Sequence, residues 1–315
     1  MLKLITPARF HDGTLMEVRK SLVTVFGPLL YLLIAAALAA LLAYPVFELS
    51  GSEDISLYRT LVSRGGQALL IVGVYPLMKW LGLNRETFGW SRRFPGQWLT
   101  GFVLGAIMLG LHVLALIGLG VREFIWPGLA PVEFLTLLGK VLAVGFGVAL
   151  LEESIFRGAL LGIAWHLSGP VRAVLVSSFY FAALHFIGTK WSTELALIGW
   201  DTGFRMALDG FSHLSLAPPD AFLGLFVAGL MLASLRVLIP ASLGLCMGMH
   251  AGWVFIIKLA KALTLLNFQS PYLYLVSGYD YFVGYLSSAW LMLLLLMFLA
   301  VFSHVHPPAS GSRRR

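Results

Sequence analysis

The stretch ALLEESIFRGALLG, residues 149–162, places two adjacent carboxylates and an arginine inside a run that is otherwise apolar. These ionisable residues are Glu152, Glu153 and Arg157. Charged side chains inside an apolar span are costly, and they usually face the interior of a helix bundle or a water-filled cavity. The stretch therefore predicts a buried helix that carries a functional site.

The rest of the chain is almost as apolar as this stretch. Hydrophobic residues make up 59% of its 315 residues and charged residues only 12%, about half the charged share of an ordinary soluble domain. Several apolar runs reach the roughly 20 residues that cross a bilayer as a helix. The composition therefore predicts an all-α, polytopic protein of the lipid bilayer without a separate soluble domain. The net charge of +7 is attributed to loop residues that set topology, not to a nucleic-acid partner.

Eight transmembrane helices are expected from the apolar runs and the turn residues between them. Their predicted ranges are 23–45, 66–83, 97–119, 133–165, 170–187, 221–239, 241–262 and 281–303. They form one domain, 23–303, between a cytoplasmic N-terminal segment, 1–22, and a disordered basic tail, 304–315. The long connection 188–220 is expected to lie at the membrane interface and to contain a short amphipathic helix.

Basic residues are unevenly distributed between the two sides of this arrangement. The loops of one side carry Arg19, Lys20, Arg85, Arg92, Arg93, Arg172 and Arg236. The loop before the second helix, on the other side, has Arg59 and Arg64 beside Glu53 and Asp54. Because cytoplasmic loops carry the excess of lysine and arginine, both termini are expected in the cytoplasm. We expect a multi-pass protein of the bacterial inner membrane.

Two histidines on other helices are expected at the depth of Glu152. Glu152 precedes the turn near Gly169 by about as many residues as His185 follows it, so an antiparallel hairpin places them at one level. His250 lies at a comparable distance beyond Pro240 on the seventh helix. The fourth, fifth and seventh helices are therefore predicted to form one catalytic cavity.

The helical period separates the roles of the two glutamates. Glu153 and Arg157 are one turn apart and stack on one face, which predicts a structural ion pair. Glu152 points to a different sector, so we expect it to face the cavity.

The seventh helix also has two distinct faces. Gly244, Gly248 and Gly252 form a stripe for close helix packing, and His250 lies roughly opposite to it. A lone buried histidine is more often a packing residue than a catalytic one, so His250 gains meaning only from Glu152 and His185. A glutamate can take a proton from water, one histidine can position that water, and a second can stabilise an oxyanion. These are the parts needed to hydrolyse an amide without a covalent nucleophile.

The order of these residues resembles a known family. E-E-x-x-x-R is present at residues 152–157, F-x-x-x-H at 181–185, and a helical histidine follows at position 250. The pattern, over about residues 145–258, resembles the CPBP family of intramembrane glutamic proteases, with a core expected at 133–262. That family includes CAAX prenyl endopeptidases, bacteriocin-processing or immunity proteins, and myxosortase-type sorting proteases.

The resemblance implies a role for each motif residue. Glu152 is implied as the general base that works with His185 on a water molecule, and His250 as the support of the oxyanion. The motif is implied to be held by Glu153, Arg157 and Phe181. No cofactor is expected, and zinc bound by histidine and glutamate is the alternative.

One position departs from the family pattern. Val254 stands where the family usually has asparagine or aspartate, and valine cannot hydrogen-bond through its side chain. Candidate replacement donors on the same helix are Trp253, Cys246 and Lys258. Losing one oxyanion donor costs about 3–4 kcal/mol in a well-studied soluble protease, which slows catalysis without abolishing it.

Three functions are consistent with these residues. The resemblance implies an intramembrane endopeptidase that cleaves near the C-terminus of a membrane-anchored or lipid-modified protein. Val254 favours the alternative of a non-catalytic CPBP-like protein that binds a peptide or lipid partner in an immunity or scaffold role. The third function is an ion-coupled transporter with Glu152 as the proton carrier. It is the least favoured, because such transporters show repeat symmetry and this sequence has none.

Overall fold

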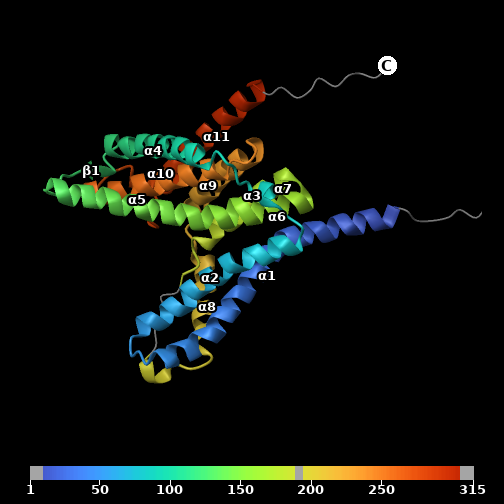
Figure 1. Ribbon diagram of the computed structural model, residues 1–315. Helices are drawn as coiled ribbons and strands as arrows, with labels where there is room; N and C mark the ends of the chain where they lie inside the picture. The colour runs from blue at the N-terminus through green and yellow to red at the C-terminus, as the bar shows by residue number, and fades with distance from the viewer. Residues whose placement is uncertain (1–9, 189–193, 306–315) are drawn as a thin grey trace, which may run out of the picture.

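The computed structural model describes residues 10–188 and 194–305, and it is built almost entirely of helices (Figure 1). Within these residues, seven helical segments are long and apolar enough to cross a membrane. They are α1 (Phe10–Ser50), α2 (Ile55–Trp80), α4 (Phe94–Gly118), the continuous segment Pro131–Ser168, α9 (Pro219–Leu238), α10 (Leu243–Leu263) and α11 (Tyr285–Val305). The chain is an integral multi-pass membrane protein, and the predicted all-α polytopic fold is confirmed. The predicted terminal segments lie partly outside the described residues, at 1–9 and 306–315.

The fifth predicted span, 170–187, is shorter than expected. Helix α7 (Pro170–Leu184) has 15 residues and is about 22 Å long, against a hydrocarbon core of about 30 Å. It ends at Leu184, three residues before the predicted end at 187. His185 immediately follows the last residue of α7, so it lies at the end of this helix.

The first two helices begin earlier than predicted. Helix α1 begins at Phe10, whereas the apolar run suggested residue 23. Helix α2 begins at Ile55 because Asp54 caps it by accepting a hydrogen bond from the Ser56 N–H at 2.8 Å. The hydrogen bonds from Ser56 also hold the pKa of the Asp54 carboxyl below its usual value. Arg64, which was assigned to a loop, therefore lies within α2.

Backbone contact between α4 and α10 forms the centre of the fold. A Cβ atom added to Gly248 or Gly252 would collide with backbone atoms of α4, and one added to Gly101 or Gly105 would collide with backbone atoms of α10. The predicted glycine stripe of α10 is thus a close helix interface. These contacts pair residues in increasing order along both helices, so α4 and α10 run parallel.

A small unpredicted sheet joins the ends of these two helices. Strand β1 (Arg122–Phe124) follows α4, strand β2 (Thr264–Leu266) follows α10, and the strands pair antiparallel with Arg122 opposite Leu266. Arg122 is buried there, and its Nε donates to the Thr264 hydroxyl at 2.6 Å. Burial holds the pKa of Arg122 below its usual value.

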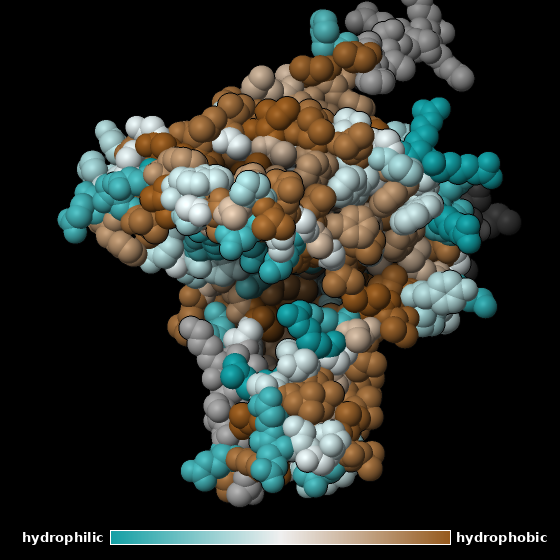
Figure 2. Space-filling view, turned by 60° about the vertical axis from the view of Figure 1, so that its left-hand side comes forward, coloured by the Kyte–Doolittle hydropathy of each residue, from teal (hydrophilic) through white to brown (hydrophobic). Residues whose placement is uncertain are grey.

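Helices α1, α2 and α8 (Thr202–Ser212) form an arm that extends from the main body (Figure 1). The core of this arm contains Ala43, Phe47, Tyr58, Val62 and Met206. Helix α8 is the amphipathic helix predicted within 188–220, and residues 189–193 of that connection lie outside the described part. Figure 2 shows a hollow where the arm meets the body.

The long helix α1 connects the arm to the body. Its N-terminal part receives a hydrogen bond from Tyr180 Oη to the Val25 carbonyl at 2.6 Å, and Ser21 Oγ accepts one from Arg172 Nη1 at 2.9 Å. Both donors belong to α7. Its C-terminal part packs on α2 and on α8, where Gly203 lies against the Ala40 backbone.

The close approach of α4 and α10 predicts that Gly248→Ala is destabilising. The new methyl group would meet the Trp98 backbone oxygen, and overpacking of this kind costs about 1–3 kcal/mol. The measurement is thermal unfolding of the purified protein in detergent. Gly110→Ala on α4 is the matched control, because no atom lies within 4 Å of its added Cβ. Equal midpoints for the two variants would contradict backbone packing at this interface.

Candidate active site

The helix that carries the two glutamates widens at the motif. Helix α5 (Pro131–Glu153) passes into a π-helical segment, η1 (Ser154–Leu160), and then into α6 (Leu161–Ser168). The single regular helix predicted at 133–165 was therefore wrong in this detail. Such π segments occur frequently at functional sites.

Neighbouring residues stabilise this π segment. The Phe156 carbonyl accepts a hydrogen bond from Ser177 Oγ of α7 at 2.9 Å in addition to the Leu161 backbone N–H. Gly158 leaves room for the Phe88 ring, which a Cβ atom would strike. The geometry of η1 thus depends on α7 and on the short helix α3 (Arg85–Phe88).

Glu153 lies at the centre of a fully buried charge cluster. Its Oε1 accepts hydrogen bonds from Arg157 Nη1 at 2.9 Å and from His250 Nδ1 at 2.8 Å. The side chains of Glu153 and Arg157 are both 0% exposed. Arg157 Nη2 also donates to the Gly229 carbonyl of α9 at 3.2 Å. The predicted ion pair is confirmed, and its link to His250 is a feature that the sequence did not reveal.

Glu152 points away from this cluster and toward both histidines. Its Oε2 lies 3.7 Å from His185 Nε2 and 3.9 Å from His250 Nε2. These separations exceed a direct hydrogen bond and suit a bridging water. The predicted convergence of Glu152, His185 and His250 is confirmed by the geometry, while their catalytic roles stay predictions.

Hydrogen bonds fix which nitrogen of each histidine faces Glu152. His185 Nδ1 lies 2.6 Å from the Phe181 carbonyl, which can only accept, so Nδ1 carries the proton. His250 Nδ1 likewise donates to the Glu153 carboxylate. Each ring therefore presents its Nε2 to Glu152.

Phe181 explains the spacing of the F-x-x-x-H motif. Its carbonyl orients His185, and its ring centroid lies 4.7 Å from that of His185 and 5.8 Å from that of His250. The Arg157 guanidinium lies over the same ring, 4.3 Å from its centroid. One phenylalanine thus contacts three ionisable side chains of the site and separates them from the remaining core.

The candidate oxyanion donors differ in availability. Trp253 is 6% exposed, and its indole N–H has no hydrogen-bond partner among the described residues. Its ring centroid lies 6.4 Å from that of His250. Cys246 Sγ donates to the Leu232 carbonyl, and Lys258 is exposed. Trp253 is therefore the best-placed substitute for the donor that Val254 lacks.

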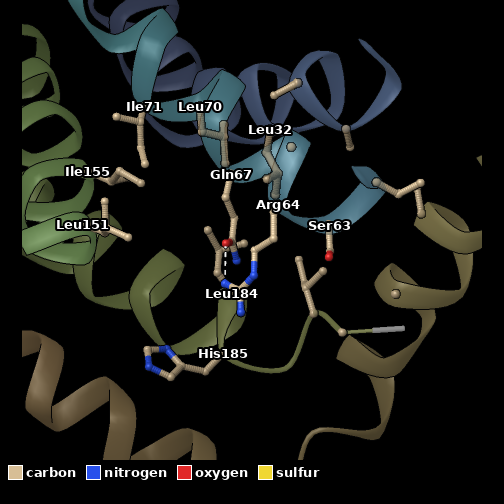
Figure 3. Close-up of a pocket in the computed structure, with 18 of the residues that line it drawn as sticks. Leu32, Ser63, Arg64, Gln67, Leu70, Ile71, Leu151, Ile155, Leu184 and His185 are labelled. Carbon is tan, nitrogen blue, oxygen red and sulfur yellow. Dashed lines mark hydrogen bonds between the residues drawn. The ribbon is translucent and has the colours of Figure 1, made fainter. Parts of the chain in front are cut away.

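A cavity of about 460 Å³ lies next to Glu152 and His185. Both residues line it, together with residues of α1, α2, α8 and η1. Figure 3 shows His185 among the lining residues. His250 does not line the cavity and lies behind Glu152, at 5% exposure. Glu152 is the more accessible glutamate, with 31% of its side chain exposed.

Tyr279 is a nearby residue that no sequence motif indicated. It lies on the connection between β2 and α11, and its ring centroid is 5.1 Å from that of Phe186, the neighbour of His185. Burial, with the negative charges of Asp280 and Glu152, raises the pKa of the Tyr279 phenol. The phenol therefore stays protonated near the Glu152 carboxylate at neutral pH.

The described residues contain no group of three or more histidine, cysteine, aspartate or glutamate side chains arranged to hold a metal ion. Glu153 Oε1 and His250 Nδ1 are bound to each other, which leaves only one ring nitrogen of His250 for other contacts. The metal-free mechanism and the zinc alternative both stay predictions.

Comparison with known proteins agrees with the predicted family resemblance. Residues 134–256 match the model of a family described as type II CAAX prenyl endopeptidase Rce1-like. The matched region contains Glu152, His185 and His250. No curated protein and no solved structure matches the chain. Helices α1 and α2 precede the matched region.

The buried cluster predicts that Glu153→Gln destabilises the protein. Removing one partner of a buried ion pair leaves the other charge uncompensated, at a cost of about 3–5 kcal/mol. Thermal unfolding in detergent measures this cost. Glu152→Gln is the matched control, because Glu152 Oε2 has no hydrogen-bond partner within the described chain and the change should shift the midpoint little. Glu153→Gln protein that is as stable as the control would show that the cluster is not structural.

Proposed function

We propose that the protein is an intramembrane endopeptidase of the glutamic type. It hydrolyses a peptide bond near the C-terminus of a membrane-anchored or lipid-modified protein. The proposal depends on one observation above all, namely that Glu152 Oε2 lies 3.7 Å and 3.9 Å from the Nε2 atoms of two histidines on other segments. The match of residues 134–256 to the Rce1-like family supports it.

In this mechanism Glu152 is the general base. Its carboxylate takes a proton from a water positioned by His185 Nε2, and the water oxygen bonds to the substrate carbonyl carbon. The carbonyl oxygen then gains negative charge. When the C–N bond breaks, Glu152 gives the proton to the leaving amine nitrogen, and the other product is a carboxylic acid.

His250 stabilises the developing oxyanion. Its Nδ1–H donates to the Glu153 carboxylate at 2.8 Å, and with a proton on Nε2 the ring donates an Nε2–H toward the oxyanion. Arg157 and Phe181 hold Glu153 and the rings in place. The buried cluster thus orients His250 through its Nδ1 atom, while Glu152 acts from the cavity next to Nε2.

The proposed setting is the bacterial inner membrane, with both termini in the cytoplasm. The distribution of lysine and arginine among the loops supports this orientation. It favours an anchored or exported substrate, as in myxosortase-type protein sorting. The proposed mechanism uses no metal ion, and a zinc ion bound by histidine and glutamate is the alternative.

The second candidate function is a non-catalytic protein that binds a peptide or lipid partner. Val254 favours it, because the side chain offers no hydrogen bond to an oxyanion. The unpartnered indole N–H of Trp253 favours catalysis, because it supplies a donor one residue away. The two candidate functions therefore differ in whether replacing Trp253 changes a rate of peptide cleavage.

The general-base role predicts that Glu152→Gln lowers peptide cleavage by about 10²–10⁴-fold. The measurement is cleavage of candidate membrane-anchored proteins co-expressed with the chain. Glu123→Gln, an exposed glutamate on β1, is the control and should cleave like the wild type. Cleavage that persists in Glu152→Gln would refute the mechanism, and loss of wild-type cleavage with a zinc chelator would select the metal alternative.

The oxyanion site predicts opposite effects for two neighbouring substitutions. Trp253→Phe should lower kcat by about 10²–10³-fold. Adding Val254→Asn to the Trp253→Phe protein should restore much of that loss, because asparagine supplies an amide donor. Trp98→Phe is the control, since Trp98 also has an unpartnered indole N–H but belongs to α4. Equal rates for Trp253→Phe and Trp98→Phe would exclude Trp253 as the donor.

A further inference from the structure

The cavity beside Glu152 contains a cation that comes from the arm. Arg64 and Gln67, on successive turns of α2, extend into the cavity toward Leu184 and His185 (Figure 3). Arg64 was expected in a loop, but α2 begins at Ile55 and places it on the cavity wall. The same cavity therefore has a carboxylate on one wall and a guanidinium on another.

Most of the surrounding surface is apolar. Several helical segments contribute this surface, with residues that include Leu32, Leu70, Ile71, Leu151, Ile155 and Leu184. Apolar walls favour apolar side chains or a lipid chain, because burying their surface removes it from water. A ligand that fits the whole cavity is therefore apolar along most of its length.

Arg64 is an exposed residue whose guanidinium is available to a ligand. Its Nη1 donates to Gln67 Oε1 at 2.8 Å, and no carboxylate of the described residues forms an ion pair with it. A guanidinium has five N–H donors in a planar fork, which matches a carboxylate in two parallel hydrogen bonds. The complementary ligand group is thus a carboxylate at the end of an apolar segment.

We propose that Arg64, oriented by Gln67, binds the free C-terminal carboxylate of the substrate. The apolar C-terminal end would then occupy the cavity between Arg64 and Glu152. This inference rests on the proposed protease function and adds the substrate feature that the site selects. Arg64 is a specificity residue, and it lies outside residues 134–256, which match the family.

In this arrangement the cleaved peptide bond lies at a fixed distance from the C-terminus of the substrate. Because Arg64 and Glu152 belong to different helices of one cavity, the bound carboxylate sets which peptide bond reaches Glu152. A substrate extended at its C-terminus, or one ending in an amide, loses the charged contact. The enzyme is therefore selective for a free, apolar C-terminus.

The test is a binding measurement that does not require turnover. Purified Glu152→Gln protein is titrated with a fluorescent ten-residue peptide that ends in four apolar residues, prepared as the free acid and as the C-terminal amide. The acid should bind at least about tenfold more tightly. Arg64→Gln in the same background should bring the acid to the affinity of the amide and leave the amide unchanged.

Matched controls separate recognition from folding. Lys79→Gln removes a cation from the same helix outside the cavity, and it should preserve the preference for the acid. Thermal unfolding of each variant checks that the arm remains folded, and Arg64→Lys should keep part of the preference. Equal affinities of the acid and the amide in the Arg64-containing protein would overturn the inference. An Arg64→Gln change that weakens both peptides equally would also overturn it, because Arg64 would then only support the cavity.

The competing occupant is a lipid headgroup phosphate. Nanodiscs with and without phosphatidylglycerol distinguish it, since an Arg64-dependent affinity for this lipid without any acid preference would replace the carboxylate assignment. Cleavage assays separate the two proposals. Glu152-dependent cleavage of acid and amide at equal rates keeps the protease and rejects carboxylate recognition. An acid preference in binding without any cleavage keeps the carboxylate site and rejects the protease.

Discussion

The buried carboxylate of Glu153 is the constraint on which the site depends. A charge removed from water must be paired and hydrogen-bonded, and Glu153 is paired through its Oε1 atom with Arg157 and His250. Through Arg157 the cluster also reaches the Gly229 carbonyl of α9. One side chain therefore joins the motif helix to α9 and α10. The position of His250 follows from satisfying this charge.

The same constraint separates the functions of two adjacent glutamates. Because Glu153 is held by the interior, Glu152 is turned to the cavity, where its Oε2 faces both Nε2 atoms. The accessible glutamate has the geometry of a base, and the buried one has the geometry of a support. Phe181 completes the arrangement, since its carbonyl fixes His185 and its ring lies against Arg157.

Much of this site could be predicted because it depends on regular helix geometry. The period of the helix indicated the Glu153–Arg157 contact, and counting residues from the turns placed Glu152, His185 and His250 at one depth. The π segment could not be predicted, because it depends on Ser177 and Gly158 contacts made in the folded bundle. The first turns of α2 were missed because they are too polar to resemble a membrane span, although Asp54 caps them. Tyr279 was missed because it reaches the site from a loop, where no period applies.

The cavity wall has two origins along the chain. The chemical groups lie within residues 134–256, while the walls supplied by α1 and α2 come from before that region. Substitutions in α1 and α2 can therefore alter the shape and charge of the wall without touching Glu152, His185 or Glu153. The ligand that the cavity accepts and the groups gathered around Glu152 are therefore encoded by separable parts of the chain. Chimeras that exchange only these helices would change the shape and charge of the cavity while leaving Glu152, His185 and Glu153 in place.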